Sequence, residues 1–420
     1  MKSISTFVAL CVLVSLGPTS APAQDVDVSS PIEIPSVAPE QVGMSSEKLA
    51  EVSRVMRGYV EDQKMVGGIV LIARKGKVCF FEAYGQADRE SNRPMRKDSI
   101  LRFYSMTKSI TTAAALMLCD EGKLSVEDPV SKYVPELATL NVISDEGDQP
   151  AIGAMTIADL MRHSSGLSYG WSGDRLAQLH NERNLLDAGN TLEQMVGKME
   201  NMPVRFEPGS GWEYSVATDV LGRVVEVVSQ QPFDTFLQKR VFDPLDMRDT
   251  GFYVPADKRS RFAACYSGQL ARLKEQDQKY ENAPAFKSGG GGLVSTARDY
   301  MRFLMMIERG GVFGGKRYLQ PETVKSMRTN QLSESVGWIR FGAEVREGVG
   351  FGFGFSVREK MSDWDPHGRV GEYGWGGAAS THYWISPKDE LIVITLEQVM
   401  PYRWLTEFGL KKQIYDAIID

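Results

Sequence analysis

The stretch from Arg102 to Ile110 constrains the fold of this chain more than any other, because an apolar helix begins inside it. Apolar residues recur every three or four positions from Met106 to Met117, so one face of this helix should face the protein core. Gly122 can close the helix without the steric penalty of a Cβ atom. The sequence therefore predicts a buried helix that follows an extended segment and ends near Glu121.

Ser105 and Lys108 stand three residues apart in the first turn of this predicted helix. Residues at that spacing share one face, with Cβ atoms about 5–6 Å apart, so the amine can reach the hydroxyl. A helix N-terminus and apolar neighbours both disfavour an ammonium ion, which would allow the amine to accept a proton. Ser105 is therefore a candidate nucleophile, with Lys108 as its base.

The Ser-x-x-Lys spacing is not specific by itself, because it recurs at Ser45-Ser46-Glu47-Lys48. That second match is typical of a helix start, with Ser45 or Ser46 as the N-cap and Lys48 on the surface. The catalytic interpretation of Ser105 therefore needs support from other segments of the chain.

The order of the predicted elements indicates an α/β fold of the α+β type. Strand-like runs occur on both sides of a mostly helical insertion, at Val66–Arg74, Val78–Tyr84, Phe351–Val357, Gly371–Ile385 and Leu391–Glu397. Hairpin-type connections favour an antiparallel sheet, which helices flank on both faces. We expect one catalytic domain over 43–420, whose α/β part comprises about 43–123 and 290–420 and whose helical part comprises about 124–289. Further helices are predicted at Ser45–Gln63, Thr156–Met161, Asp219–Ser229, Thr296–Arg309 and Trp404–Ile418.

Residues 1–23 have the pattern of a secretory signal peptide. Lys2 is followed by an apolar run from Phe7 to Leu16 and by the cleavage signal Ala21-Pro22-Ala23. Residues 24–42 are rich in Pro, Ser and Val, which predicts an extended segment. No later stretch is apolar enough to cross a bilayer. We therefore expect an exported protein, either periplasmic or secreted.

Composition excludes several classes of partner. The formal net charge is −6 and no basic runs occur, which argues against binding to nucleic acid or to anionic membranes. The few cysteines do not form a disulfide scaffold. The four histidines, at 163, 180, 367 and 382, lack metal-ligand spacing, so neither a metal nor another cofactor is expected.

Two further segments carry possible chemistry. Tyr214 precedes a predicted helix, where its hydroxyl could enter a cleft and exchange protons; alone, it could equally be a packing residue. Trp375, Gly376 and Gly377 lie in a predicted strand whose glycines would let a substrate approach closely, or would merely mark a bulge. The N–H groups of Ser105 and Ala378 could then form an oxyanion hole.

With these segments in this order, the chain resembles serine hydrolases of the class C β-lactamase and penicillin-binding type, most of all the family VIII carboxylesterases. The likeness covers roughly residues 36–420 and includes the stretches Leu160–Leu167 and Gly289–Ser295. It implies a β-lactamase/transpeptidase-like fold. It also implies that Ser105 is acylated, that Lys108 and Tyr214 share the base role, and that Trp375-Gly376-Gly377 replaces the Lys-Thr-Gly of the lactamases.

Two departures from the lactamase pattern favour an esterase. Val216 stands where class C lactamases carry an asparagine, and Trp375 stands where they carry a lysine. The loss of an amide and of a cation should weaken binding of an anionic lactam and favour a neutral ester. The predicted partner is thus a small-molecule ester or acyl compound, and the oligomeric state is open.

Three alternatives accompany this interpretation. The same machinery suits a β-lactamase or a D-Ala-D-Ala peptidase, and a slow variant would act as a cell-wall-binding protein. Gly166-Leu167-Ser168-Tyr169-Gly170 also fits the nucleophile elbow of α/β-hydrolases, but a helix precedes it instead of a strand.

Candidates for an aromatic wall of the cleft are Tyr169, Trp171, Trp212, Trp338, Phe351, Phe353 and Trp375.

Overall fold

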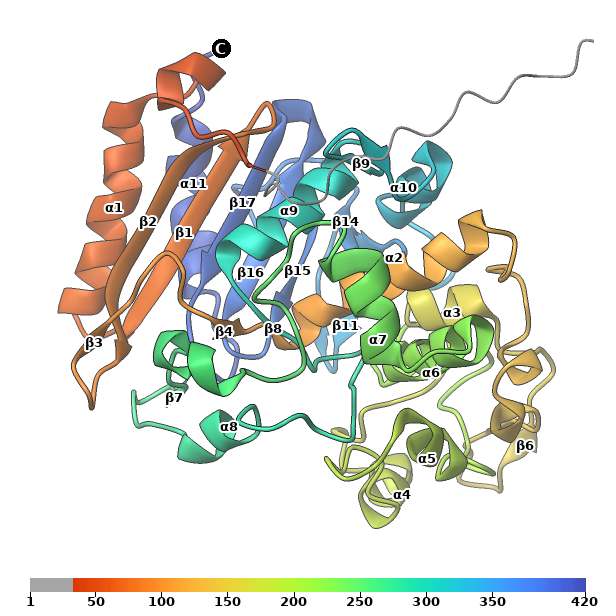
Figure 1. Ribbon diagram of the computed structural model, residues 1–420. Coiled ribbons are helices and arrows are strands. Elements are labelled where there is room, and N and C mark those ends of the chain that lie inside the picture. Colours follow the sequence, from red (N-terminus) through yellow and green to blue (C-terminus); the bar gives the residue numbers. More distant parts are fainter. Residues whose placement is uncertain (1–32) are drawn as a thin grey trace, which may run out of the picture. The chain divides into compact units, whose positions relative to one another are not determined.

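The computed structural model describes residues 33–420 (Figure 1). The predicted signal peptide and the first part of the predicted extended segment, residues 24–32, lie outside the described residues. Ser36 pairs with Val78 as an isolated bridge, so this part of the chain is extended. Pro39–Val42 instead forms one turn of 3-10 helix, because proline at the first position holds a helical φ.

An eight-stranded sheet forms the centre of the fold, in the order β13-β14-β15-β16-β17-β1-β2-β3. Every neighbouring pair is antiparallel, which confirms the predicted sheet. Ile69 lies opposite Leu396, so strands from the two ends of the sequence join in the middle. The strands are β1 (Gly67–Arg74), β2 (Lys77–Asp88), β3 (Arg93–Pro94), β13 (Val349–Phe351), β14 (Ser356–Arg358), β15 (Tyr373–Gly377), β16 (Thr381–Ser386) and β17 (Leu391–Leu396).

Two of the predicted strands are each two strands in the structure. The run predicted at Phe351–Val357 contains the turn between β13 and β14, and the run predicted at Gly371–Ile385 contains the turn between β15 and β16. The second turn includes Ser380, whose φ of 60° reverses the chain. Both runs are rich in apolar residues, because each strand is buried, so hydrophobicity alone did not mark the turns.

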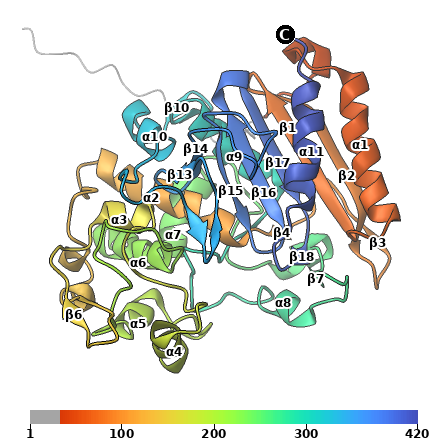
Figure 2. The ribbon, with the colours of Figure 1, turned by 180° about the vertical axis from the view of Figure 1, so that it is seen from behind.

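Helices cover both faces of the sheet (Figures 1 and 2). On one face lie α1 (Ser46–Glu61) and α11 (Leu405–Asp416), whose apolar sides contact the sheet. The other face carries α2 (Thr107–Asp120) and α9 (Ala297–Glu308). Ser45 caps α1 by accepting a hydrogen bond from the Lys48 N–H at 3.2 Å, so this second Ser-x-x-Lys pattern is a helix start, as predicted.

The segment between α2 and α9 is mostly helical and lies beside the sheet. Its helix α6 packs against α2 and begins just after Val216. Thr156 caps α3 with a reciprocal bond to Asp159, at the start of a helix that the sequence predicts. The remaining α-helices are α3 (Ile157–Met161), α4 (Arg175–Glu182), α5 (Leu192–Gly197), α6 (Ala217–Ser229), α7 (Phe233–Leu237), α8 (Lys274–Gln278) and α10 (Pro321–Met327).

Short elements complete the fold and connect its larger parts. The short strands are β4 (Leu101–Arg102), β5 (Asn141–Val142), β6 (Gln149–Pro150), β7 (Tyr266–Ser267), β8 (Val294–Ser295), β9 (Val312–Phe313), β10 (Lys316–Arg317), β11 (Arg340–Phe341), β12 (Glu344–Val345) and β18 (Val399–Met400). The short helical turns are Val130–Lys132, Pro135–Leu137, Gln238–Phe242, Ala256–Arg261 and Pro387–Asp389. In the part of the chain that the structure describes, no helix has the length and apolarity to span a bilayer.

The entry to α2 is held rigidly. Ser105 lies in a short 3-10 helix, Tyr104–Met106, between β4 and α2. Tyr104 has a φ of 41°, a left-handed conformation that costs energy in a residue with a side chain. Arg102, which is fully buried, fixes the preceding strand by donating hydrogen bonds to Ala263 O at 2.7 Å and Gln398 Oε1 at 2.9 Å. The backbone conformation that presents Ser105 is therefore imposed by its surroundings.

Candidate active site

Ser105 and Lys108 lie together at the start of α2. Lys108 is 1% exposed, and its Nζ is 3.3 Å from Ser105 Oγ. The same amine donates to Gly290 O at 2.6 Å and to Tyr169 OH at 2.8 Å. The amine therefore contacts three oxygen atoms, which fix it beside the serine hydroxyl.

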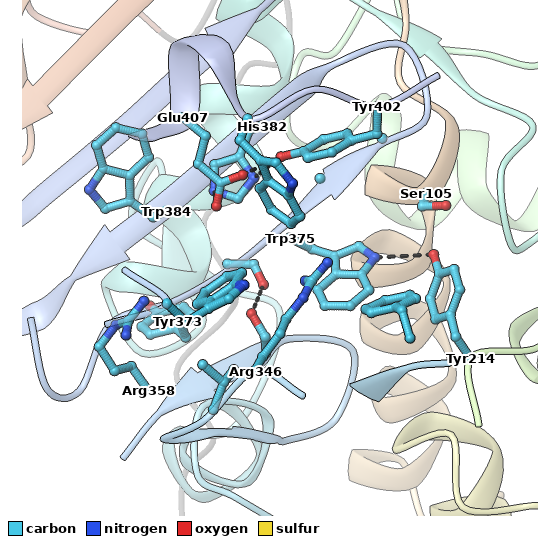
Figure 3. Close-up of a pocket in the computed structure, with 18 of the residues that line it drawn as sticks. Ser105, Tyr214, Arg346, Arg358, Tyr373, Trp375, His382, Trp384, Tyr402 and Glu407 are labelled. Carbon is cyan, nitrogen blue, oxygen red and sulfur yellow. Dashed lines mark hydrogen bonds and ion pairs between the residues drawn. The ribbon is translucent and has the colours of Figure 1, made fainter. Parts of the chain in front are cut away.

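Tyr214 and Trp375 reach the same place from distant segments (Figure 3). Trp375 Nε1 donates to Tyr214 OH at 3.2 Å, and Lys108 Nζ lies 4.5 Å from the centre of the Tyr214 ring. The structure therefore brings together Ser105, Lys108, Tyr214 and Trp375. The contact between Lys108 and Tyr214 is through the ring face, so no direct hydrogen bond joins the amine to that phenol in the described chain.

The end of β15 lies against the short helix that carries Ser105. A Cβ atom at Gly377 would overlap the carbonyl oxygen of Phe103, so only glycine allows this approach. Gly376, Gly377 and Ala378 line one cavity together with Ser105. The sequence predicts that a substrate approaches Gly376 and Gly377 closely and that the Ala378 N–H is the second donor of the oxyanion hole.

The cavity has a volume of about 370 Å³ and extends from Ser105 past Trp375 toward α11. Ser105 and Tyr214 lie at one end (Figure 3), and His382, Trp384 and Glu407 lie farther in. Aromatic side chains form much of its wall, namely Trp171, Tyr214, Phe341, Trp364, Tyr373, Trp375, Trp384, Tyr402 and Trp404. An acyl or alcohol group of moderate size therefore fits beside the serine.

Some of the aromatic residues expected in the wall are there and others are not. Trp375 and Trp171 line the cavity. Phe351 packs behind it, with its ring 5.1 Å from that of Trp375. The described residues that line the cavity do not include Tyr169, Trp212, Trp338 or Phe353. Spacing along the sequence could not separate these cases, because the wall is assembled from separate loops and strands.

Tyr169 and Asp219 lie behind Lys108, in a part of the site that the sequence did not reveal. The sequence suggested Tyr169 only as part of an aromatic wall, and Asp219 not at all. Tyr169 OH accepts the Lys108 amine, and burial raises the pKa of Tyr169 well above its ordinary value, with Asp219 adding to the effect. The carboxylate of Asp219 accepts from Ser288 Oγ at 2.6 Å and from Gly290 N at 3.0 Å. A Cβ atom at Gly290 would lie 2.5 Å from Asp219 Oδ2 and 2.8 Å from Tyr169 OH. In the sequence, the signal for Asp219 is a single acidic residue in the otherwise apolar first part of α6.

Burial raises the pKa of Asp219, while the hydrogen bond from Ser288 and the charge of Lys108 oppose the rise. The carboxyl group lies at 0% exposure, so a nearby cation is needed to hold it ionised. Lys108 thus contacts Ser105 and Tyr169 directly and interacts electrostatically with the buried Asp219.

Ser168 has a different environment from Ser105. Its hydroxyl donates to Glu213 Oε1 at 2.9 Å and accepts from the Gly170 N–H. Within the described chain no histidine ring bonds to the Ser168 hydroxyl, since His180 bonds to the backbone of Ser168 instead. Ser168 also follows the turn after α3 and not a strand. The arrangement is not a nucleophile elbow.

A hydrogen-bonded cluster of His382, Tyr402 and Glu407 forms the inner end of the cavity (Figure 3). His382 Nε2 is 3.0 Å from Glu407 Oε1, and Tyr402 OH donates to the other oxygen of Glu407. Burial lowers the pKa of His382 well below its ordinary value, assisted by the charges of Lys411 and Arg346. Burial also raises the pKa of Glu407 to about 7. The His382–Glu407 contact is therefore a hydrogen bond from a neutral imidazole near neutral pH.

Glu407 should make stability depend on pH. Between pH 4.5 and about 7 its carboxyl group stays protonated in the folded protein while the unfolded chain releases the proton, so rising pH favours unfolding. Relative to Glu407→Gln, the wild-type free energy of unfolding should fall by up to about 3 kcal/mol across this range and then level off. Urea unfolding from pH 4 to 8 measures the difference. A flat difference would contradict the prediction, and Glu322→Gln, whose side chain is 84% exposed, is the control.

Comparisons with known proteins agree with this geometry. The sequence matches the family described as beta-lactamase over residues 52–403. It is 31% identical over 361 residues to esterase EstB of Burkholderia gladioli, covering 80% of this chain and 86% of EstB. It is 30% identical over 374 residues to lovastatin esterase of Penicillium rubens, covering 81% and 91%. The solved structure of EstCE1, described as a hydrolase with promiscuous acyltransferase activity, has a TM-score of 0.75 at 27% identity, over 88% of this chain and 99% of EstCE1.

Proposed function

The chain belongs to the beta-lactamase family and is a serine hydrolase, and we propose that it is a carboxylesterase that forms an acyl-enzyme on Ser105. One observation carries the proposal. Ser105, held beside the Lys108 amine at 3.3 Å, opens into an aromatic cavity that it shares with Tyr214. The similarity to EstB and to lovastatin esterase supports an ester as the substrate.

In the proposed reaction, Ser105 Oγ attacks the ester carbonyl while Lys108 and Tyr214, which share the base role, accept its proton. The N–H groups of Ser105 and Ala378 stabilise the oxyanion. Tyr214 then protonates the departing alcohol as the tetrahedral intermediate breaks down to the acyl-enzyme. A water molecule then gives a proton to the same groups and attacks the acyl carbonyl. The bond between Ser105 Oγ and the acyl group breaks, the acid is released, and Lys108 and Tyr214 return the proton to Ser105 Oγ.

Trp375 favours an ester over a β-lactam in this proposal. Its indole N–H donates to Tyr214 OH, at the position where the resembled lactamases present a lysine. A bulky neutral donor replaces a flexible cation beside the tyrosine, so the carboxylate of a bound lactam would lack its usual partner there. Val216, which is fully buried, offers no side-chain amide in its place.

Three chromogenic assays test the proposal on the purified protein. We expect kcat/KM for p-nitrophenyl butyrate to exceed that for a chromogenic cephalosporin by roughly 100-fold or more, because a mismatched polar partner in a site costs about that factor. A D-Ala-D-Ala peptide should be cleaved still less. Faster hydrolysis of the cephalosporin would favour the lactamase alternative. Release of a single equivalent of p-nitrophenol per protein would instead indicate a binding protein.

A further inference from the structure

Arg346 follows β12 and projects into the cavity beside Trp375 (Figure 3). Its side chain is only 13% exposed. Four aromatic rings surround the guanidinium carbon, at centroid distances of 4.3 Å (Phe341), 4.7 Å (Trp404), 5.0 Å (Trp364) and 5.8 Å (Trp375). One of these, Trp375, also donates to Tyr214, so a single ring separates Arg346 from the catalytic end of the cavity.

Arg346 lacks a close acceptor in the part of the chain that the structure describes. Its Nε is buried without a hydrogen-bond partner, and the nearest carboxylate oxygen, Glu344 Oε1, is 3.6 Å away on a half-exposed side chain. Burial lowers the pKa of Arg346, which reflects the cost of removing this charge from water. The charge of Arg346 is therefore only weakly compensated by the protein, through one long and half-exposed ion pair.

The other two cations that line the cavity differ from Arg346. Arg358 Nη2 lies 2.6 Å from Asp365 Oδ2, and Lys411 Nζ lies 2.8 Å from Glu372 Oε2. Both are thus neutralised by direct ion pairs within the protein. Among the described residues, Arg346 pairs only with Glu344, at 3.6 Å through Nε and on a half-exposed side chain.

The remaining groups near Arg346 do not supply a closer partner than Glu344. Glu407 contributes to the field at Arg346, but its carboxyl group already bonds to His382 and Tyr402. Trp384, which also lines the cavity, has an indole N–H with no acceptor among the described residues. The inner cavity therefore has donors in excess, and a ligand that enters it must bring acceptors.

We propose that Arg346 binds a carboxylate carried by the substrate, so that the preferred esters are half-esters with a free acid on the acyl or the alcohol part. A guanidinium held between ring faces presents its N–H edge in one plane, which suits bidentate recognition of a carboxylate. This inference rests on the proposed esterase function and replaces the expectation of a neutral ester.

Pairs of anionic and neutral esters test the inference and distinguish the two positions of the acid. On the acyl side, mono-p-nitrophenyl glutarate is compared with p-nitrophenyl valerate. On the alcohol side, 4-acetoxybenzoate is compared with its methyl ester. We expect one anionic ester to have the higher kcat/KM in its pair. Arg346→Met should lower that anionic-to-neutral ratio by roughly 10- to 100-fold, and Arg346→Lys should retain part of it.

Arg340→Met is the matched control, because it removes the same charge from an exposed position on β11 of the same hairpin. Its anionic-to-neutral ratio should equal that of the wild type. Equal losses on both esters of a pair in Arg346→Met, or no anionic preference in the wild type, would overturn the inference while leaving the esterase function intact.

A binding measurement separates the failure of the inference from failure of the proposed function. If no ester is hydrolysed, the proposed function fails, and thermal unfolding with glutarate or neutral glutaramide still tests Arg346. Glutarate should raise Tm more than glutaramide in the wild type and not in Arg346→Met. Equal shifts for the two compounds in the wild type would overturn the anion site.

Discussion

Ser105→Ala is expected to lower kcat/KM for p-nitrophenyl butyrate by roughly 10⁴- to 10⁶-fold, the cost of removing the nucleophile from a serine hydrolase. The hydroxyl is the group within reach of Lys108 Nζ that also opens into the cavity. The substitution removes one oxygen from a half-buried residue, so thermal unfolding should change little. Initial rates and Tm of the purified variant provide the measurement.

Ser168→Ala is the matched control for that experiment. Ser168 bonds to Glu213 outside the cavity, so its loss should change the rate by only a few fold. A fluorophosphonate probe followed by peptide mapping should label the peptide that contains Ser105. Loss of activity in Ser168→Ala alone, or a label on Ser168, would reverse the assignment.

Tyr214→Phe is expected to lower kcat by roughly 10²- to 10⁴-fold, because it removes a proton carrier but keeps the ring. The ring is needed for its contacts with Lys108 and Trp375. The decrease should be largest for esters with a poorly departing alcohol, which depends on protonation, and smaller for p-nitrophenyl esters. Single-turnover measurements with alkyl and p-nitrophenyl butyrates distinguish the two cases.

Tyr169→Phe is the comparison variant, since the Tyr169 hydroxyl also contacts Lys108. Because burial raises the pKa of Tyr169 well above its ordinary value, this residue stays a neutral phenol and positions the amine. We expect a loss of about 10-fold, similar for both classes of ester, as for one lost hydrogen bond to a charged group. A larger loss in Tyr169→Phe than in Tyr214→Phe would exchange the two roles.

The sequence was sufficient for the fold because its main signals are local. The apolar period of α2, the cap at Ser45 and the strand runs of β1 and β17 each depend on neighbouring residues. The paired Ser105 and Lys108 follow from helix geometry alone. The turn at Ser380 was missed because both flanking strands are buried, so polarity does not change across it.

The deeper parts of the site could not be predicted in this way. Asp219 and Gly290 meet across 71 residues of sequence, and the surroundings of Arg346 come from four separate segments. No periodicity encodes such contacts, because they depend on how loops fold back over the sheet. Burial and hydrogen-bond partners identify these residues once the coordinates are known.

The pairing of β1 with β17 also governs when the site can exist. Ile69 can pair with Leu396 only after more than 300 further residues have been synthesised. During that time, β1 in the nascent chain has one edge without a partner strand. Contacts between residues so far apart in the sequence form slowly, and until they form, the exposed apolar strand can pair with other chains. Fragments that end before Leu391 should therefore depend on chaperones and lack hydrolysis, even though they contain Ser105, Lys108, Tyr214 and Trp375.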